Sequence, residues 1–223
     1  MPPEGAASAY SLGMTEISMN KAIHGAVRRD LDRFITALST FREGDLGRAQ
    51  KLSTAWANFD DQLTHHHEDE HAIAWPALER VGISNQILAT MDAEHETMAA
   101  ALAETRTAMH VLAHRAGSEE SKTALAAFQK LQAVTVEHLD HEEAEIEDVY
   151  MSKRKTAEIK AMGKAFGKVS PVRAGRFFAW VLDGASPAER EAVARDVPGP
   201  VVSIIGGIFG RGYRKNVAPV WNS

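Results

Sequence analysis

The sequence predicts an all-α protein, an up-down-up-down four-helix bundle followed by a C-terminal extension of short helices. In four long segments of the first 150 residues, apolar residues recur at alternating spacings of three and four, the period of an amphipathic helix. Pro76 is the one proline within residues 4–170. The short gaps between the segments contain Gly44, Gly82 and Gly117. Short gaps make consecutive helices antiparallel, which predicts a bundle.

Each of the four expected helices has its own inward-facing stripe. The helices are expected at about residues 15–39, 45–78, 84–116 and 119–150. In chain order, the stripes include Val27, Leu31 and Phe34; Leu52, Trp56, Phe59 and Ile73; Leu88, Met91 and Met98; and Leu125, Phe128 and Val149. These stripes supply the apolar surface that the helices bury against one another.

Composition limits the chemistry of the chain. The 223 residues are 44% hydrophobic and 25% charged, which is typical of a folded globular protein. Cysteine is absent, which excludes disulfides, thiolate metal sites and a cysteine nucleophile. A metal ion would therefore be held by nitrogen and oxygen atoms.

Charge is distributed unevenly along the chain. Residues 1–150 carry a net charge of −13 and residues 151–223 a net charge of +8. The acidic body argues against nucleic acid as a partner, because phosphate binding needs clustered lysine and arginine. The first residues lack a basic region followed by an apolar core, so we expect no signal peptide and a cytoplasmic location. The longest apolar run, around residues 201–209, is too short to span a bilayer, and we favour packing of the extension within the protein over contact with a membrane surface.

Six polar residues interrupt the stripes near the middle of the helices. They are His24, His66, Glu70, His95, His138 and Glu142. With a rise of about 1.5 Å per residue, counting from the three turns places all six at a similar depth in the bundle. Buried carboxylates and imidazoles destabilise a fold unless hydrogen bonds or cations compensate them.

These six residues have the composition of a metal site. Two pairs, His66 with Glu70 and His138 with Glu142, are spaced i,i+4, which puts both members on one helix face. Six ligands exceed what one tetrahedral zinc ion takes. Two ions that share bridging carboxylates would use them all. Mixed imidazole and carboxylate donors favour iron, with zinc and manganese as alternatives.

Other histidines are expected outside this site. His65, His67 and His71 lie off the stripe of the second helix, so we expect surface positions or supporting roles for them. A competing i,i+4 pair, His141 with Glu145, lies one turn deeper and largely off the stripe of the fourth helix. We therefore favour the pair that lies on the stripe.

These motifs resemble the hemerythrin-like (HHE cation-binding) proteins. The pattern H…HxxxE…H…HxxxE carries the resemblance over residues 15–150, with HHHEDEHAIAWPAL, AEHETM and HLDHEEAEI around the histidines. The resemblance implies a non-haem di-iron site with the six residues above as ligands. It also implies binding of, or reaction with, dioxygen, peroxide or nitric oxide.

Two departures from the oxygen-carrying members of that family change the expectation. Those members have a His-x-x-x-His pair on the third helix, whereas this chain has Met91 four residues before His95. Their last ligand is an aspartate at a longer spacing, where this chain has Glu142. A missing histidine implies that one iron is more open, which favours redox chemistry or sensing over reversible oxygen carriage.

The extension is expected to contain short helices. Ser170 and Ser186 each precede a proline, the pattern of an N-cap followed by proline at the first helical position. Helices are expected at about residues 171–183 and 187–196, with a third after residue 200. A group of apolar side chains is expected to pack on the bundle or on a second subunit, in a homodimer: Phe177, Phe178, Trp180, Val181 and Leu182.

The chain is thus expected to have a flexible N-terminus (residues 1–14), a di-iron bundle (15–150) and a basic helical extension (151–223). We predict a non-haem di-iron protein that binds or reacts with dioxygen or peroxide, and an oxidase or a peroxide-decomposing enzyme is one form of this prediction. The alternative is a sensor of oxygen, nitric oxide or iron that signals through the extension. A metal-free helical scaffold is the third interpretation.

Overall fold

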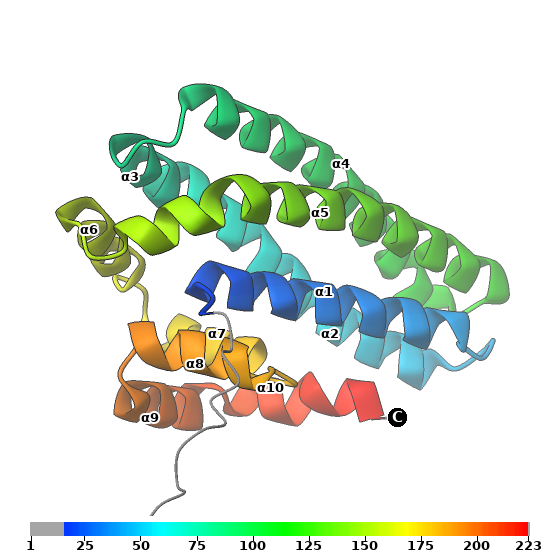
Figure 1. Cartoon of the computed structure of the whole chain (residues 1–223). Helices are drawn as coiled ribbons and strands as arrows, with labels where there is room; N and C mark the ends of the chain where they lie inside the picture. Colours follow the sequence, from blue (N-terminus) through cyan, green and yellow to red (C-terminus); the bar gives the residue numbers. More distant parts are fainter. Residues whose placement is uncertain (1–15, 223) are drawn as a thin grey trace, which may run out of the picture.

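The computed structural model describes residues 16–222, and within them it contains helices and no strand. The expected flexible segment, residues 1–14, lies outside the described residues. Four long helices form the bundle: α1 (Met19–Ser39), α2 (Leu46–Asp69), α4 (Asn85–Arg115) and α5 (Ser118–Lys153). Helix α5 packs against both α1 and α4, and α2 packs against α4 (Figure 1). The predicted all-α bundle is confirmed.

Local sequence signals determine where the bundle helices begin. The side chains of Ser18, Asp45 and Ser84 accept hydrogen bonds from backbone N–H groups in the first turns of α1, α2 and α4. Such N-caps satisfy donors that a helix leaves unpaired. Gly82 has a φ of +112°, which glycine adopts at little cost. This glycine lies in the turn that reverses the chain before α4.

The helix expected at residues 45–78 is interrupted by one π-helical turn, η1 (Glu70–Ala74), before α3 (Trp75–Arg80). In this turn the backbone N–H of Trp75 donates to the carbonyl of Glu70. A π turn holds more residues than an α turn, so it shifts which residues face inward. Ala74 and Trp75 are buried, while Ile73 is partly exposed. The expectation that Ile73 lies on the buried stripe is wrong for this reason.

Two apolar clusters fill the bundle. The larger one contains the stacked rings of Phe34 and Phe128, with centroids 4.4 Å apart, and Trp56. The smaller one surrounds Trp75 and Met91 and includes a residue of α6 (Ala157–Phe166), a helix that the sequence did not predict. On α2, α4 and α5 the predicted polar residues fall between members of the two clusters. Apolar layers therefore border the polar site on both sides.

The extension continues through four further helical segments that pack beside the bundle (Figure 1). They are α7 (Pro171–Val181), α8 (Pro187–Asp196), α9 (Gly199–Phe209) and α10 (Arg211–Asn216), followed by the 3₁₀ turn η2 (Ala218–Asn222). Phe178, Trp180 and Val181 are buried in the same cluster as the bundle core, with Phe177 and Leu182 packed against it. Among the described helices, no single one is long and apolar enough to cross a membrane.

A polar contact joins the extension to α1. Trp180 Nε1 donates to Asp30 Oδ2 at 2.9 Å, and Arg33 bridges Asp30 and Asp183 at 3.0 and 3.1 Å. The hydroxyl of Tyr213 donates to Asp183 at 2.9 Å. Because Asp30 is buried, these partners compensate a carboxylate inside the interface.

Candidate metal centre

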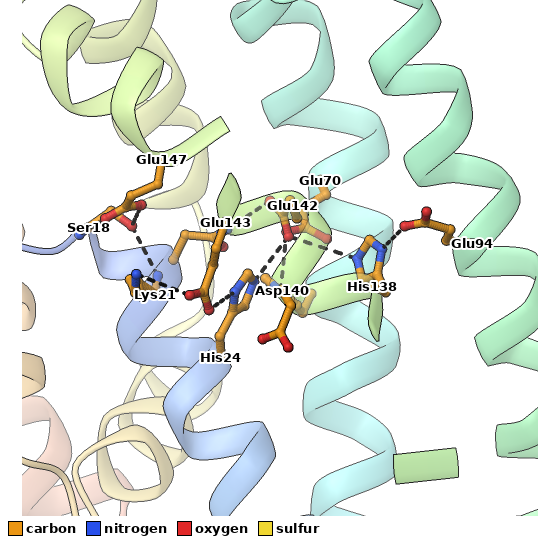
Figure 2. A network of polar contacts seen from close by, with 12 residues as sticks. Ser18, Lys21, His24, Glu70, Glu94, His138, Asp140, Glu142, Glu143 and Glu147 are labelled. Carbon is orange, nitrogen blue, oxygen red and sulfur yellow. Dashed lines mark hydrogen bonds and ion pairs between the residues drawn. The ribbon is translucent and has the colours of Figure 1, made fainter. Parts of the chain in front are cut away.

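Side chains from the four bundle helices meet between the two apolar clusters (Figure 2). The residues are His24 of α1; His66 and His67 of α2; Glu70 at the start of η1; His95 of α4; and His138 and Glu142 of α5. The six residues predicted from the sequence thus lie together. His67 is the one additional member within the described part of the chain.

Hydrogen bonds hold α1 in register with α5. The backbone N–H and the hydroxyl of Ser18 donate to the two carboxylate oxygens of Glu147 at 2.8 and 2.6 Å. Ser18 also caps α1, so its position fixes the start of that helix. About two helical turns after Ser18, His24 Nε2 lies 3.1 Å from Glu142 Oε2. The N-cap therefore helps to place an α1 imidazole against an α5 carboxylate.

Glu70 lies between histidines of different helices. Its Oε1 atom is 3.2 Å from His66 Nε2, and its Oε2 atom is 3.5 Å from His95 Nε2. His95 Nε2 is in turn 3.0 Å from His138 Nε2. A carboxylate with one oxygen toward each of two imidazoles has the arrangement of a bridging ligand.

The ligand atoms fall into two groups that share Glu70. One group contains His24, His66, Glu70 and Glu142, and the other contains His67, Glu70, His95 and His138. Within each group one possible ligand atom per residue lies within 4.8 Å of all the others. Nitrogen and oxygen donors at these separations suit a first-row transition metal in each group.

Unpaired buried atoms test whether these residues fit a cation. Six side-chain atoms of the two groups are buried without a hydrogen-bond partner: His24 Nε2, His66 Nε2, His67 Nε2, Glu70 Oε1 and Oε2, and Glu142 Oε2. Buried polar atoms in folded proteins are almost always paired. All six are potential metal ligands, and they point toward one another rather than toward other protein donors. The donor set therefore fits two metal cations.

Carboxylates behind the histidines fix their orientation, as Figure 2 shows for His24 and His138. His24 Nδ1 lies 3.0 Å from Glu143 Oε1, and His138 Nδ1 lies 2.9 Å from Glu94 Oε2. Because a carboxylate accepts a hydrogen bond, each Nδ1 carries a proton, and in the neutral ring Nε2 then keeps a lone pair toward the centre. Such partners orient metal-binding imidazoles and raise their basicity.

Burial keeps several of the imidazoles neutral. It lowers the pKa of His66 and of His67 well below the usual value, and neighbouring histidines add to this effect. It lowers the pKa of His95 to about 4. Metal ions bind the neutral imidazole. These three side chains are therefore in the metal-binding form at neutral pH.

The two central carboxyl groups differ in ionisation. Burial, aided by the charge of Glu142, raises the pKa of Glu70 well above its usual value. Burial opposes ionisation of Glu142 as well, but His24, His138 and His95 together outweigh it and lower the pKa of Glu142. For His24, Glu142 and Glu143 outweigh burial and raise the pKa. Without further positive charge, one of the two carboxyl groups is thus held back from ionising.

The remaining histidines of the HHHEDEH segment separate into two kinds. His65 and His71 are partly or largely exposed and contact Asp61 and Asp92, as expected for positions off the stripe. His67 instead points into the bundle, where its ring stacks on that of His95. Successive residues on a helix diverge by about 100°. His66 and His67 therefore reach the two groups from either side of the helix face that bears Glu70, so the expected position of His67 was wrong.

The competing pair on α5 does not join either group. His141 is about two-fifths exposed and its Nδ1 contacts Glu94 Oε1 at 2.7 Å, while Glu145 is exposed. His138 and Glu142, in contrast, are almost fully buried. The apolar stripe of the fourth helix correctly separated the two pairs.

The fold and this donor set define a helical-bundle protein with a site for metal cations. The profile of the hemerythrin HHE cation-binding domain matches residues 15–150, so the chain belongs to that family, as the sequence motifs predicted. No curated protein and no solved structure matches the chain. The cation-binding domain and the two His/Glu groups together indicate a metal-binding protein.

Proposed function

We propose that the chain is a non-haem di-iron protein whose centre binds or reacts with dioxygen or peroxide. The observation that carries the proposal is the pair of four-residue groups joined through Glu70, with six unpaired ligand atoms between them. When bound there, two irons would supply electrons to a small oxidant. Zinc and manganese accept the same donors, so metal analysis is part of the test.

The protein residues have defined tasks in this proposal. His24, His66, His95 and His138 would hold the metals through imidazole nitrogens, and the shared Glu70 would balance charge between them. Glu94 and Glu143 hold the outer nitrogens of two of these rings. The apolar clusters on either side limit the access of water to the centre.

The test is peroxide consumption by the full chain, loaded with ferrous iron and freed of unbound metal. We expect the rate to scale with bound iron and to fall at least tenfold in His24→Ala, with the matched variant His65→Ala unaffected. A rate that is independent of bound iron would contradict the proposal. Turnover of peroxide would make the protein an enzyme. A cytoplasmic location is part of the same proposal.

A sensor of oxygen, nitric oxide or iron is a second candidate, favoured by the contacts of α1. This helix carries His24 in the centre and, further along, Arg29 and Asp30 at the extension. Arg29 pairs with Glu189 of α8 at 2.7 Å, and Asp30 accepts from Trp180 of α7 at 2.9 Å. A displacement of α1 on ligand binding would therefore reach both helices.

Limited proteolysis distinguishes the sensor from the reactive protein. A sensor predicts that cleavage of the extension changes when the iron-loaded chain meets nitric oxide or dioxygen, without consumption of peroxide. Identical cleavage patterns in the presence and absence of these gases would remove the sensor. The extension as a homodimer contact is a separate proposal, which light scattering of the full chain checks.

A further inference from the structure

Helix α9 carries an uncovered apolar stripe. Val201, Ile204 and Ile208 are 39%, 61% and 51% exposed. Their spacing of three and four residues puts them on one side of the helix. Phe209, at the end of α9, is 37% exposed and lies beside this stripe, toward α7. Large aliphatic side chains in such a row mark an interaction surface.

The opposite side of α9 is fixed on α7. A side chain at Gly175 of α7 would meet Phe209 Cβ at 2.5 Å and the carbonyl oxygen of Ile205 at 2.7 Å, so the two helices approach closely. Val172 lies one turn before Gly175 and is 54% exposed. It is therefore near the end of α9 that carries Phe209. Helix α9 packs on α7 beside the bundle (Figure 1). The exposed side chains of the stripe are therefore uncovered.

The charge around this surface is positive. Residues 159–182 contain five lysines and arginines and residues 197–223 contain three, with no acidic residue in either segment, whereas residues 183–196, which include α8, contain four acidic and two basic residues. Lys168 precedes α7, and Arg211, Arg214 and Lys215 follow α9; all four side chains are exposed, and Arg214 donates to the carbonyl oxygens of Gly206 and Gly207 of α9. Arg176 of α7 instead pairs with Asp61 of α2. The acidic residues of the chain belong mainly to the bundle.

We propose that the α9 face binds the surface of an anionic lipid bilayer. The stripe would enter the boundary between headgroups and acyl chains, and the cations would contact lipid phosphates. A second copy of the chain fits this surface less well, because it would bring two basic faces together. The sequence favoured packing of the extension on the bundle or on a second subunit over contact with a membrane surface, and the exposed stripe of α9 is the observation that changes this expectation.

The contact is peripheral because the neighbouring helix is not available to the membrane. α8 packs against α1 through the buried side chains of Ala192 and Val193. It is therefore held by the bundle, which leaves α9 and the first turn of α7 to meet the lipid. This proposal does not depend on which metal the bundle binds.

Co-sedimentation of the full chain with vesicles tests the proposal. We expect binding to vesicles of phosphatidylcholine mixed with phosphatidylglycerol, weaker binding at high salt, and little binding to phosphatidylcholine alone. Ile204→Asp combined with Ile208→Asp should lower the bound fraction about fivefold or more. Arg211→Glu combined with Lys215→Glu should remove the preference for the anionic lipid.

Leu46→Asp is the matched control, because Leu46 is also exposed (45%) but begins α2 on the bundle. It should bind like the wild-type chain. Serine at positions 204 and 208 provides a second, milder variant, and circular dichroism verifies that each variant is folded. Absence of wild-type binding to anionic vesicles, or binding unchanged by folded stripe variants, would overturn the proposal. A wild-type dimer that Ile204→Asp with Ile208→Asp converts to a monomer would overturn it in favour of a second copy.

Discussion

The imidazole rings of His67 and His95 stack with their centroids 4.1 Å apart and their planes inclined by 20°. His67 comes from α2 and His95 from α4, and both belong to the group that also contains His138 and Glu70. From the sequence we expected that the missing histidine of the third helix leaves one metal ion more open. In the structure, His67 lies beside His95 on that side. A third imidazole faces that position from α2.

The first prediction concerns this additional histidine. His67→Ala should weaken binding of one of the two metal ions by about 100-fold or more and leave the other bound, because His67 belongs to one group alone. Isothermal titration of the metal-free chain measures both affinities. His65→Ala is the control on the same helix turn, and equal behaviour of the two variants would show that His67 is not a ligand.

The second prediction concerns the shared carboxylate. Glu70→Gln should weaken both metal ions, because Glu70 belongs to both groups. The same change should stabilise the metal-free chain at neutral pH, since burial raises the pKa of Glu70 and the glutamine amide has no charge to bury. Thermal unfolding with and without metal measures both effects.

Glu68→Gln, at an exposed position two residues away, should change neither quantity. If Glu70→Gln destabilised the metal-free chain while metal still stabilised it normally, the shared-ligand role would be wrong.

The third prediction concerns a positioning residue. Glu94 accepts from Nδ1 of His138 at 2.9 Å and is not itself in either group. Glu94→Gln should reduce metal affinity about 10- to 100-fold while secondary structure and metal-free stability change little. Competition with a chelator gives the affinity. Glu96→Gln, exposed on the same helix, should retain wild-type affinity, and a similar loss there would indicate a general charge effect.

The fourth prediction concerns pH and the joint between bundle and extension. Burial raises the pKa of Asp30, although Trp180 and Arg33 partly oppose the shift. A carboxyl group whose pKa rises on folding contributes stability below its unfolded pKa of about 3.9 and loses it as pH rises through the folded value. Asp30→Asn should therefore gain stability relative to wild type as pH rises from about 3 to 7. Urea unfolding over this range measures the difference, and a difference that is constant with pH would contradict the assignment.

Sequence periodicity was sufficient to predict the bundle and six residues of the centre. His24, His95 and Glu142 lie on apolar stripes at equal depth. In a straight helix, residue spacing alone determines the depth and the face of each side chain. Glu70 was predicted in the same way because it is the first residue of the irregular turn, before the helix face shifts.

The irregular turn was not predictable from periodicity. A π turn changes the relation between residue number and helix face. The buried positions are therefore Ala74 and Trp75 rather than Ile73. His67 was missed for a related reason. A helix with a single inward stripe has no place for adjacent inward residues, whereas α2 contributes His66 to one group of possible ligands and His67 to the other. The run of three histidines, His65 to His67, is the feature of the sequence that could have indicated a second inward-facing imidazole on this helix.

The central claim is that buried charge and unpaired nitrogen atoms in this bundle are compensated by two cations. The most direct test is elemental analysis of the full chain purified without added metal and then reconstituted with ferrous iron. The account predicts two iron ions per chain, one for each group, and loss of both in Glu70→Gln. A wild-type chain that is folded and holds no metal after reconstitution would contradict it.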